Sequence, residues 1–77
     1  MGIVAGILRV SKGGARKTHI MYQNNLSFKQ LRVYLGFLTN SGLVREKLKS
    51  GSSIFETTDK GFAFLQAYNS LKALLGE

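Results

Sequence analysis

The 77-residue sequence contains no cysteine and a single histidine, so disulfides and thiolate metal sites are excluded. A domain of this length has one core rather than two, and it commonly needs a further source of stability. Since disulfides are absent, regular helix packing or self-association is expected to supply that stability.

Acidic residues are scarce: one aspartate and three glutamates are scattered along the chain. Neither these residues nor His19 have a spacing that indicates a catalytic dyad. Arg16-Lys17-Thr18 follows Gly13-Gly14 as in a phosphate-binding loop, but the glycine directly before the lysine and a preceding strand are missing. We therefore expect no enzymatic activity, no metal, no cofactor and no small-molecule substrate.

Long apolar runs are also missing, and none approaches the roughly 20 residues that span a bilayer. The apolar stretch from Met1 to Val10 carries Arg9 and is not followed by a cleavage-type segment, so it is not typical of a signal peptide. These absences predict a protein without membrane contact, located in the cytoplasm and, given its charge, associated with the nucleoid.

Positive charge is the strongest feature that is present. Eleven Lys and Arg residues against four acids give a formal net charge of +7. Residues 1–50 hold nine of the basic residues and one acid, a net charge of +8, whereas residues 51–77 have a net charge of −1. Charge localised in this way is typical of a surface that meets a polyanion, although a generically soluble basic protein has a similar composition.

Hydrophobic periodicity and turn residues predict the order of the elements. We expect helices over residues 3–12, 17–23 and 27–40, the last one capped by Ser27. Strand-like runs follow at 43–48 and 53–58, joined by a turn at 49–52, and a final helix begins after Thr58 and extends to about residue 75. The buried face of the third helix is predicted to consist of Phe28, Leu31, Tyr34, Leu35 and Leu38.

This order predicts an α+β fold, mostly α: a winged helix-turn-helix with a C-terminal dimerisation helix. Residues 1–58 would form the winged head and residues 59–77 the C-terminal helix, all within one structural domain. Residues 27–40 are then the recognition helix for the major groove, and residues 44–57 are the basic wing on the flanking backbone.

Basic and polar residues on three of these elements are the candidate DNA-binding residues. They are Arg16, Lys17, Thr18, Lys29, Gln30, Arg32, Val33, Arg45, Lys47 and Lys49. Strand alternation places the three basic residues of the wing on one face, where they either contact phosphate or protect a strand edge from aggregation. Val33 meets a thymine methyl or is a tolerated surface residue, and Gly36 indicates close approach of a phosphate backbone or of a neighbouring helix.

The last helix carries apolar residues at the spacing of a short coiled coil. They are Phe64, Tyr68, Leu71, Leu74 and Leu75. Either the helix packs entirely on its own core, or these residues form a homodimer interface, which we favour because little else compensates for the small core.

Two motifs resemble a known family. The segment from Gly14 to Tyr22, followed by Asn25-Leu26-Ser27-Phe28, is similar to the Lys-Thr-(Arg/His)-Ile-Met-Tyr and Asn-Leu-Ser-(Tyr/Phe) signature of small archaeal winged-helix proteins, among them the 10a-type DNA-binding proteins. The resemblance implies a homodimer joined by an antiparallel coiled coil of C-terminal helices, with two winged heads on duplex DNA. A coil that ends at Glu77 would be shorter than that of the 10a type, and Gly36 replaces what is usually a larger residue.

The leading hypothesis is therefore a dimeric protein that binds double-stranded DNA, either as a transcription regulator or as a chromatin protein of the nucleoid. The alternative is a winged-helix protein–protein interaction module whose basic face binds an acidic partner.

Overall fold

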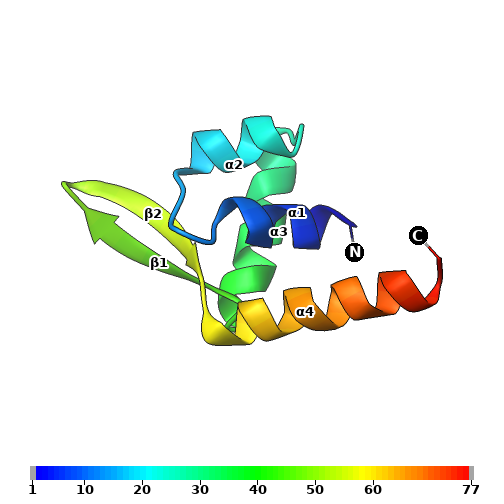
Figure 1. Cartoon of the computed structure of the whole chain (residues 1–77). Helices are drawn as coiled ribbons and strands as arrows, with labels where there is room; N and C mark the ends of the chain where they lie inside the picture. Colours follow the sequence, from blue (N-terminus) through cyan, green and yellow to red (C-terminus); the bar gives the residue numbers. More distant parts are fainter. Residues whose placement is uncertain (1, 77) are drawn as a thin grey trace.

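The computed structural model describes residues 2–76, so residues 1 and 77 of the predicted segments lie outside it. The elements follow the predicted order: α1 (Gly2–Val10), α2 (Lys17–Gln23), α3 (Phe28–Asn40), β1 (Val44–Lys49), β2 (Ser52–Thr57) and α4 (Asp59–Leu74). Figure 1 shows α1, α2 and α3 gathered into one body, with the β-hairpin extending from it on the side away from the chain ends. The predicted α+β winged helix-turn-helix is confirmed.

Helices α2 and α3 form the helix-turn-helix, and their junction is determined by local hydrogen bonds. Asn25 adopts a left-handed conformation with φ of 52°, which turns the chain after α2. Ser27 then caps α3: its Oγ accepts from the Gln30 backbone N–H at 3.1 Å, while Gln30 Oε1 accepts from the Ser27 N–H at 2.9 Å. This reciprocal capping box satisfies two otherwise free donors and sets the start of the helix.

The two strands of the wing pair in antiparallel register, with Arg45 opposite Glu56 and Lys49 opposite Ser52. Ser50 and Gly51 form the turn, both at positive φ, the geometry that matches the right-handed twist of a tight hairpin. Ala15, before α2, adds a third strand position: its N–H and C=O both bond to Phe55, at 2.9 and 2.8 Å. This bridge ties the wing to the start of α2.

The core lies between α1, α2, α3 and the base of the wing. Its fully buried members include Ile7, Leu8, Ile20, Leu31 and Leu38. The prediction that Phe28 belongs to this core is wrong, since Phe28 is 60% exposed. Phe28 is the first residue of α3, where the helix extends past the core, and Leu26, just before the cap, is buried in its place.

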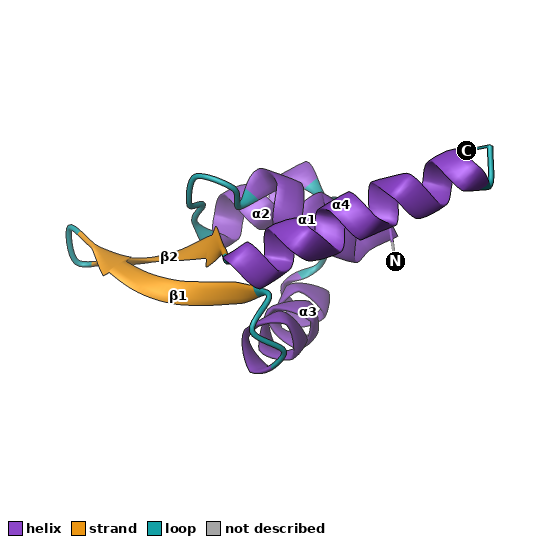
Figure 2. Cartoon of the chain, turned by 60° about the horizontal axis from the view of Figure 1, so that its bottom comes forward, coloured by secondary structure: helices purple, strands orange, loops and turns teal. Residues whose placement is uncertain are grey.

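Helix α4 is anchored mainly by its first half, and Tyr68 is the last of its side chains that packs against the core. Thr58 Oγ1 accepts from the Gly61 N–H and donates to the Gly42 carbonyl, and Leu65 is buried in the core. Gly61 is required here because a Cβ would collide with the Leu43 carbonyl oxygen. The second half of α4 extends beyond the body, as Figure 2 shows.

Candidate nucleic-acid interface

The exposed side of α3 carries positive charge without compensation from its own helix. Leu31, Leu35 and Leu38 face the core, so the opposite side of the helix is left open. Lys29, Arg32 and Val33 border one shallow hollow on that side. The helix contains no acidic residue. Val33 is 66% exposed, so it is available to an outside partner as the sequence suggested.

A second hollow lies between α3 and the start of the wing. Lys17, Arg32, Gly36 and Glu46 are among its lining residues, and Phe55 forms part of the wall. The Lys17 Nζ lies 5.9 Å from the centroid of the Phe55 ring, a cation–π distance that holds this charge at the junction of α2 and β2. Arg32 borders both hollows, so the charges of α3 and α2 form a continuous surface.

Gly36 faces open space in this second hollow. A Cβ built on it would have no heavy atom within 4 Å apart from its chain neighbours and the backbone of α3 itself, so no neighbouring helix in residues 2–76 requires a glycine there. Of the two explanations given by the sequence, close approach of a neighbouring helix is therefore excluded within the described residues 2–76. Close approach of a ligand is the explanation that is left.

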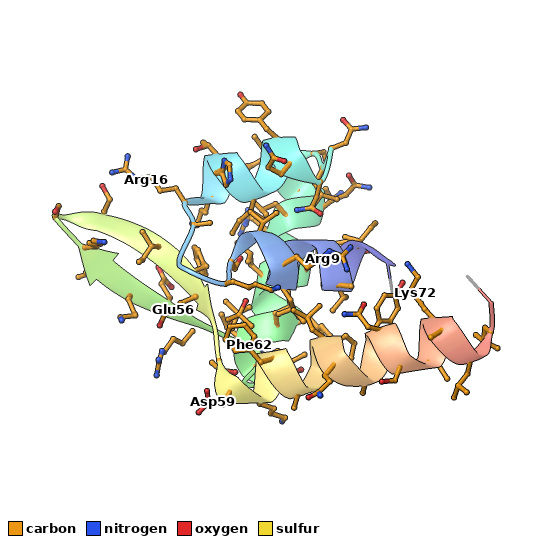
Figure 3. The ribbon with its side chains drawn as sticks, viewed as in Figure 1. Arg9, Arg16, Glu56, Asp59, Phe62 and Lys72 are labelled. Carbon is orange, nitrogen blue, oxygen red and sulfur yellow. The ribbon has the colours of Figure 1, made fainter. Side chains whose placement is uncertain are left out.

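Arg16 and Lys49 come together at the far end of the wing. They border a hollow with Gly13, Gly14 and Ser50. Figure 3 shows Arg16 beside the wing, just before α2. Thr18 lies in the first turn of α2 and is exposed. The start of α2 thus connects the charge of α3 to that of the wing tip.

The other two basic residues of the wing are already paired. Glu56 Oε1 lies 3.1 Å from an Arg45 guanidinium nitrogen and 3.5 Å from Lys47 Nζ. The hydrogen bond from Arg45, together with the charge of Lys47, lowers the pKa of Glu56. Both cations therefore have a carboxylate beside them, unlike Lys29 and Lys49, for which the structure of residues 2–76 shows no salt bridge.

The pairing register confirms that Arg45, Lys47 and Lys49 lie on one face of the wing. That face is the outer one, because the buried Val44 and Phe55 belong to the opposite face, toward α3. The wing therefore presents Glu46, not Arg45 or Lys47, to the hollow beside α3. Sequence reasoning did not single out Glu46, although the same alternation that grouped the three basic residues placed it on the other face.

Gln30 has a local role that the sequence reasoning did not assign. Its side-chain oxygen accepts from the Ser27 N–H in the capping box. Its amide NH2 group is the part left to meet a ligand.

Apolar side chains collect along one side of α4, from its middle to its C-terminal end. Phe64, Ala67, Tyr68 and Leu71 line an almost wholly apolar hollow, and the Phe64 and Tyr68 rings stack with centroids 6.5 Å apart. Leu71, Leu74 and Leu75 are 56%, 84% and 65% exposed. The alternative in which α4 packs entirely on its own core is therefore wrong.

Residues 2–76 offer neither a metal site nor a membrane-spanning helix. No group of three His, Asp or Glu side chains there is placed to hold a metal ion. No helix of this part of the chain has the length and apolar character needed to cross a bilayer.

Fold and sequence together define the class of protein. Residues 1–76 match the winged helix-turn-helix family, and the chain belongs to that family. Its fold is also that of a solved structure, the crystal structure of Sso10a-2, a DNA-binding protein from Sulfolobus solfataricus. The TM-score is 0.85 at 22% sequence identity, over 96% of this chain and 78% of that one. No curated protein sequence matches the chain. These findings confirm the winged-helix family inferred from the sequence, and the chain has the fold of a 10a-type protein, as the resemblance implied.

Proposed function

We propose that the protein binds double-stranded DNA as a homodimer, acting as a transcription regulator or a nucleoid-associated protein. The observation that carries the proposal is the open side of α3, where Lys29 and Arg32 are exposed on a helix without acids. In a winged helix-turn-helix this helix is the one that enters the major groove. Lys29 and Arg32 then bond to phosphates or to base edges.

The wing supplies a secondary contact through its tip. Lys49 lies next to the Ser50–Gly51 turn, and Arg16 borders the same hollow. With α3 in the major groove, this tip reaches the flanking backbone, where the two charges meet phosphate. Arg45 and Lys47 lie on the outer face beside Glu56 and contribute less.

The exposed half of α4 supports the homodimer. An apolar surface of this kind on a small protein favours association, and a two-fold contact between identical surfaces is the commonest way to close it. Two copies of α4 packed along Phe64, Tyr68 and Leu71 would bury this hollow and place two heads on one duplex. Linking two heads raises affinity through effective concentration.

Charge reversal on α3 tests the DNA-binding surface. Lys29→Glu combined with Arg32→Glu should reduce affinity for every duplex if both residues contact phosphate. It should also lower the magnitude of the slope of log K against log salt concentration by about 2, since each neutralised phosphate contributes roughly 0.9. Fluorescence anisotropy with a labelled duplex at several salt concentrations measures both quantities.

The matched control is Lys12→Glu combined with Lys60→Glu. It makes the same change in net charge in a separate hollow, next to Arg45 and Asp59. The control should change the salt slope by less than half as much as the α3 variant. If the α3 variant bound duplexes as tightly as the wild type, the proposal would be wrong.

An acidic protein partner is the competing outcome of this experiment. A module built for such a partner would bind poly-glutamate as tightly as duplex DNA. A duplex-binding protein should instead prefer the duplex at every salt concentration, because its charges are spaced for the phosphates of a helix.

A further inference from the structure

An unpaired acid lies on the surface that is proposed to meet DNA. Glu46 is exposed and lines the hollow between α3 and β1 together with Lys17 and Arg32. Within residues 2–76, Glu46 makes no salt bridge, although two cations border the same hollow. Glu56, on the other face of the wing, forms salt bridges with two cations.

A carboxylate in this position opposes non-specific binding. Phosphate and carboxylate repel each other, and an acid within a basic surface also reduces the field that attracts the duplex. The position is favourable only when the duplex offers a hydrogen-bond donor to the carboxylate. In the major groove, base amino groups are such donors, and an acidic side chain accepts characteristically from cytosine N4.

Arg32 supplies the complementary half of such a contact. Arg32 borders the hollow that Glu46 lines, and arginine donates characteristically to guanine O6 and N7. A G·C base pair presents these two acceptors and the cytosine amino donor side by side in the major groove. An A·T pair lacks the two adjacent acceptors.

Gly36 leaves room for a base pair at this point. It lines the same hollow, and apart from its chain neighbours and the backbone of its own helix no heavy atom of residues 2–76 lies within 4 Å of the position where its Cβ would be. A glycine in the middle of a helix costs about 1 kcal/mol relative to alanine, and no packing contact of the chain accounts for it. The missing side chain lets the edge of a base pair come between Arg32 and Glu46.

We propose that Arg32 and Glu46 together select a G·C base pair, with Arg32 donating to guanine and Glu46 accepting from the cytosine amino group. The inference rests on the proposed DNA-binding function and adds to it a specificity-determining residue. If this contact forms, the protein recognises the DNA sequence directly at this base pair, in addition to the shape of the backbone.

The test compares two variants, each of which removes one glutamate from a different face of the wing. Glu46→Thr and Glu56→Thr each remove one negative charge and place a strand-favouring residue in the hairpin. Duplexes enriched by the wild type from a random pool are first used to find the preferred G·C position. Dissociation constants are then measured for that duplex and for one with A·T at this position.

The wild type and Glu56→Thr should prefer the G·C duplex about tenfold, within the range of a good base contact. Glu46→Thr should bind the A·T duplex more tightly than the wild type does, and its preference for G·C should fall to about threefold, the part that Arg32 alone supplies. Thermal melting checks that both variants are folded.

Two results would overturn this inference and leave DNA binding intact. One is salt-dependent duplex binding by the wild type with no base-pair preference, and the other is a preference in Glu46→Thr that is as large as that of the wild type. A wild type that fails to bind any duplex would overturn the proposed function and this inference together.

Discussion

Helices α3 and α4 each leave one side uncovered, but the two uncovered sides differ in chemistry. The open side of α3 carries Lys29 and Arg32 and no acid. The open side of α4 carries Leu71, Leu74 and Leu75. A charged surface attracts its partner through the field around it, whereas an apolar surface gains free energy only by direct contact. The difference is consistent with the two proposed partners: a polyanion for α3 and a second apolar helix for α4.

The two helices also differ in how the rest of the chain holds them. Leu31, Leu35 and Leu38 anchor α3 along most of its length, so its open side is a firm platform. By contrast, α4 is anchored at Gly61 and Leu65, and its last turns project beyond the body. No other segment of residues 2–76 covers the leucines of these projecting turns.

The largest expected effect comes from adding charge to the apolar side of α4. Leu71→Lys combined with Leu75→Lys should prevent the proposed dimer from forming, because two lysines cannot be buried in an apolar interface. Loss of the second head should lower DNA affinity by about a hundredfold, although the variant gains two positive charges. Light scattering gives the mass, and anisotropy gives the affinity.

A matched variant separates the interface from the added charge. Gln66→Lys combined with Ala73→Lys adds the same charges on other exposed positions of α4. It should remain dimeric and bind DNA at least as tightly as the wild type. A wild type with the mass of one chain at micromolar concentration would remove the dimer from the proposal.

A smaller effect is expected on α3, where stability and binding should change in opposite directions. Gly36→Ala should raise the free energy of unfolding by about 1 kcal/mol, because alanine favours a helix and nothing obstructs its Cβ. The same methyl group should weaken DNA binding, since it occupies the space that a base pair would enter. Urea denaturation and anisotropy measure the two quantities.

Asn69→Ala on α4 serves as the control for helix propensity. It should also stabilise the fold, but DNA affinity should stay the same. If Gly36→Ala bound DNA as the wild type does, the duplex would not approach α3 closely at this position.

The smallest effect is expected within the wing, where Lys47 is paired with Glu56 and Lys49 has no salt bridge within residues 2–76. Lys49→Ala should lower the magnitude of the salt slope by about 1, because this residue lies near Arg16 at the tip and would neutralise one phosphate. Lys47→Ala should lower it by less, since Glu56 is already beside this amine. Equal slopes for the two variants would contradict the assignment of the tip as the contact.

Local signals in the sequence determined the elements and their order. Ser27 and Thr58 predicted the starts of α3 and α4, because a capping hydroxyl bonds to an N–H only three residues away. Strand alternation correctly placed Arg45, Lys47 and Lys49 on one face of the wing. The apolar spacing of α4 likewise located the leucines that remain exposed. Each of these features depends on residues close together in the chain.

Only the tertiary structure decided which distant residues meet. The bridge from Ala15 to Phe55 joins segments 40 residues apart, and no periodicity within either segment indicates it. The exposure of Phe28 depends on where the core ends, which the helical spacing of α3 does not specify. The same holds for Glu46, since its place beside Arg32 follows from how the wing packs against α3. Periodicity determines the face on which a side chain lies, but packing between elements determines what that face meets.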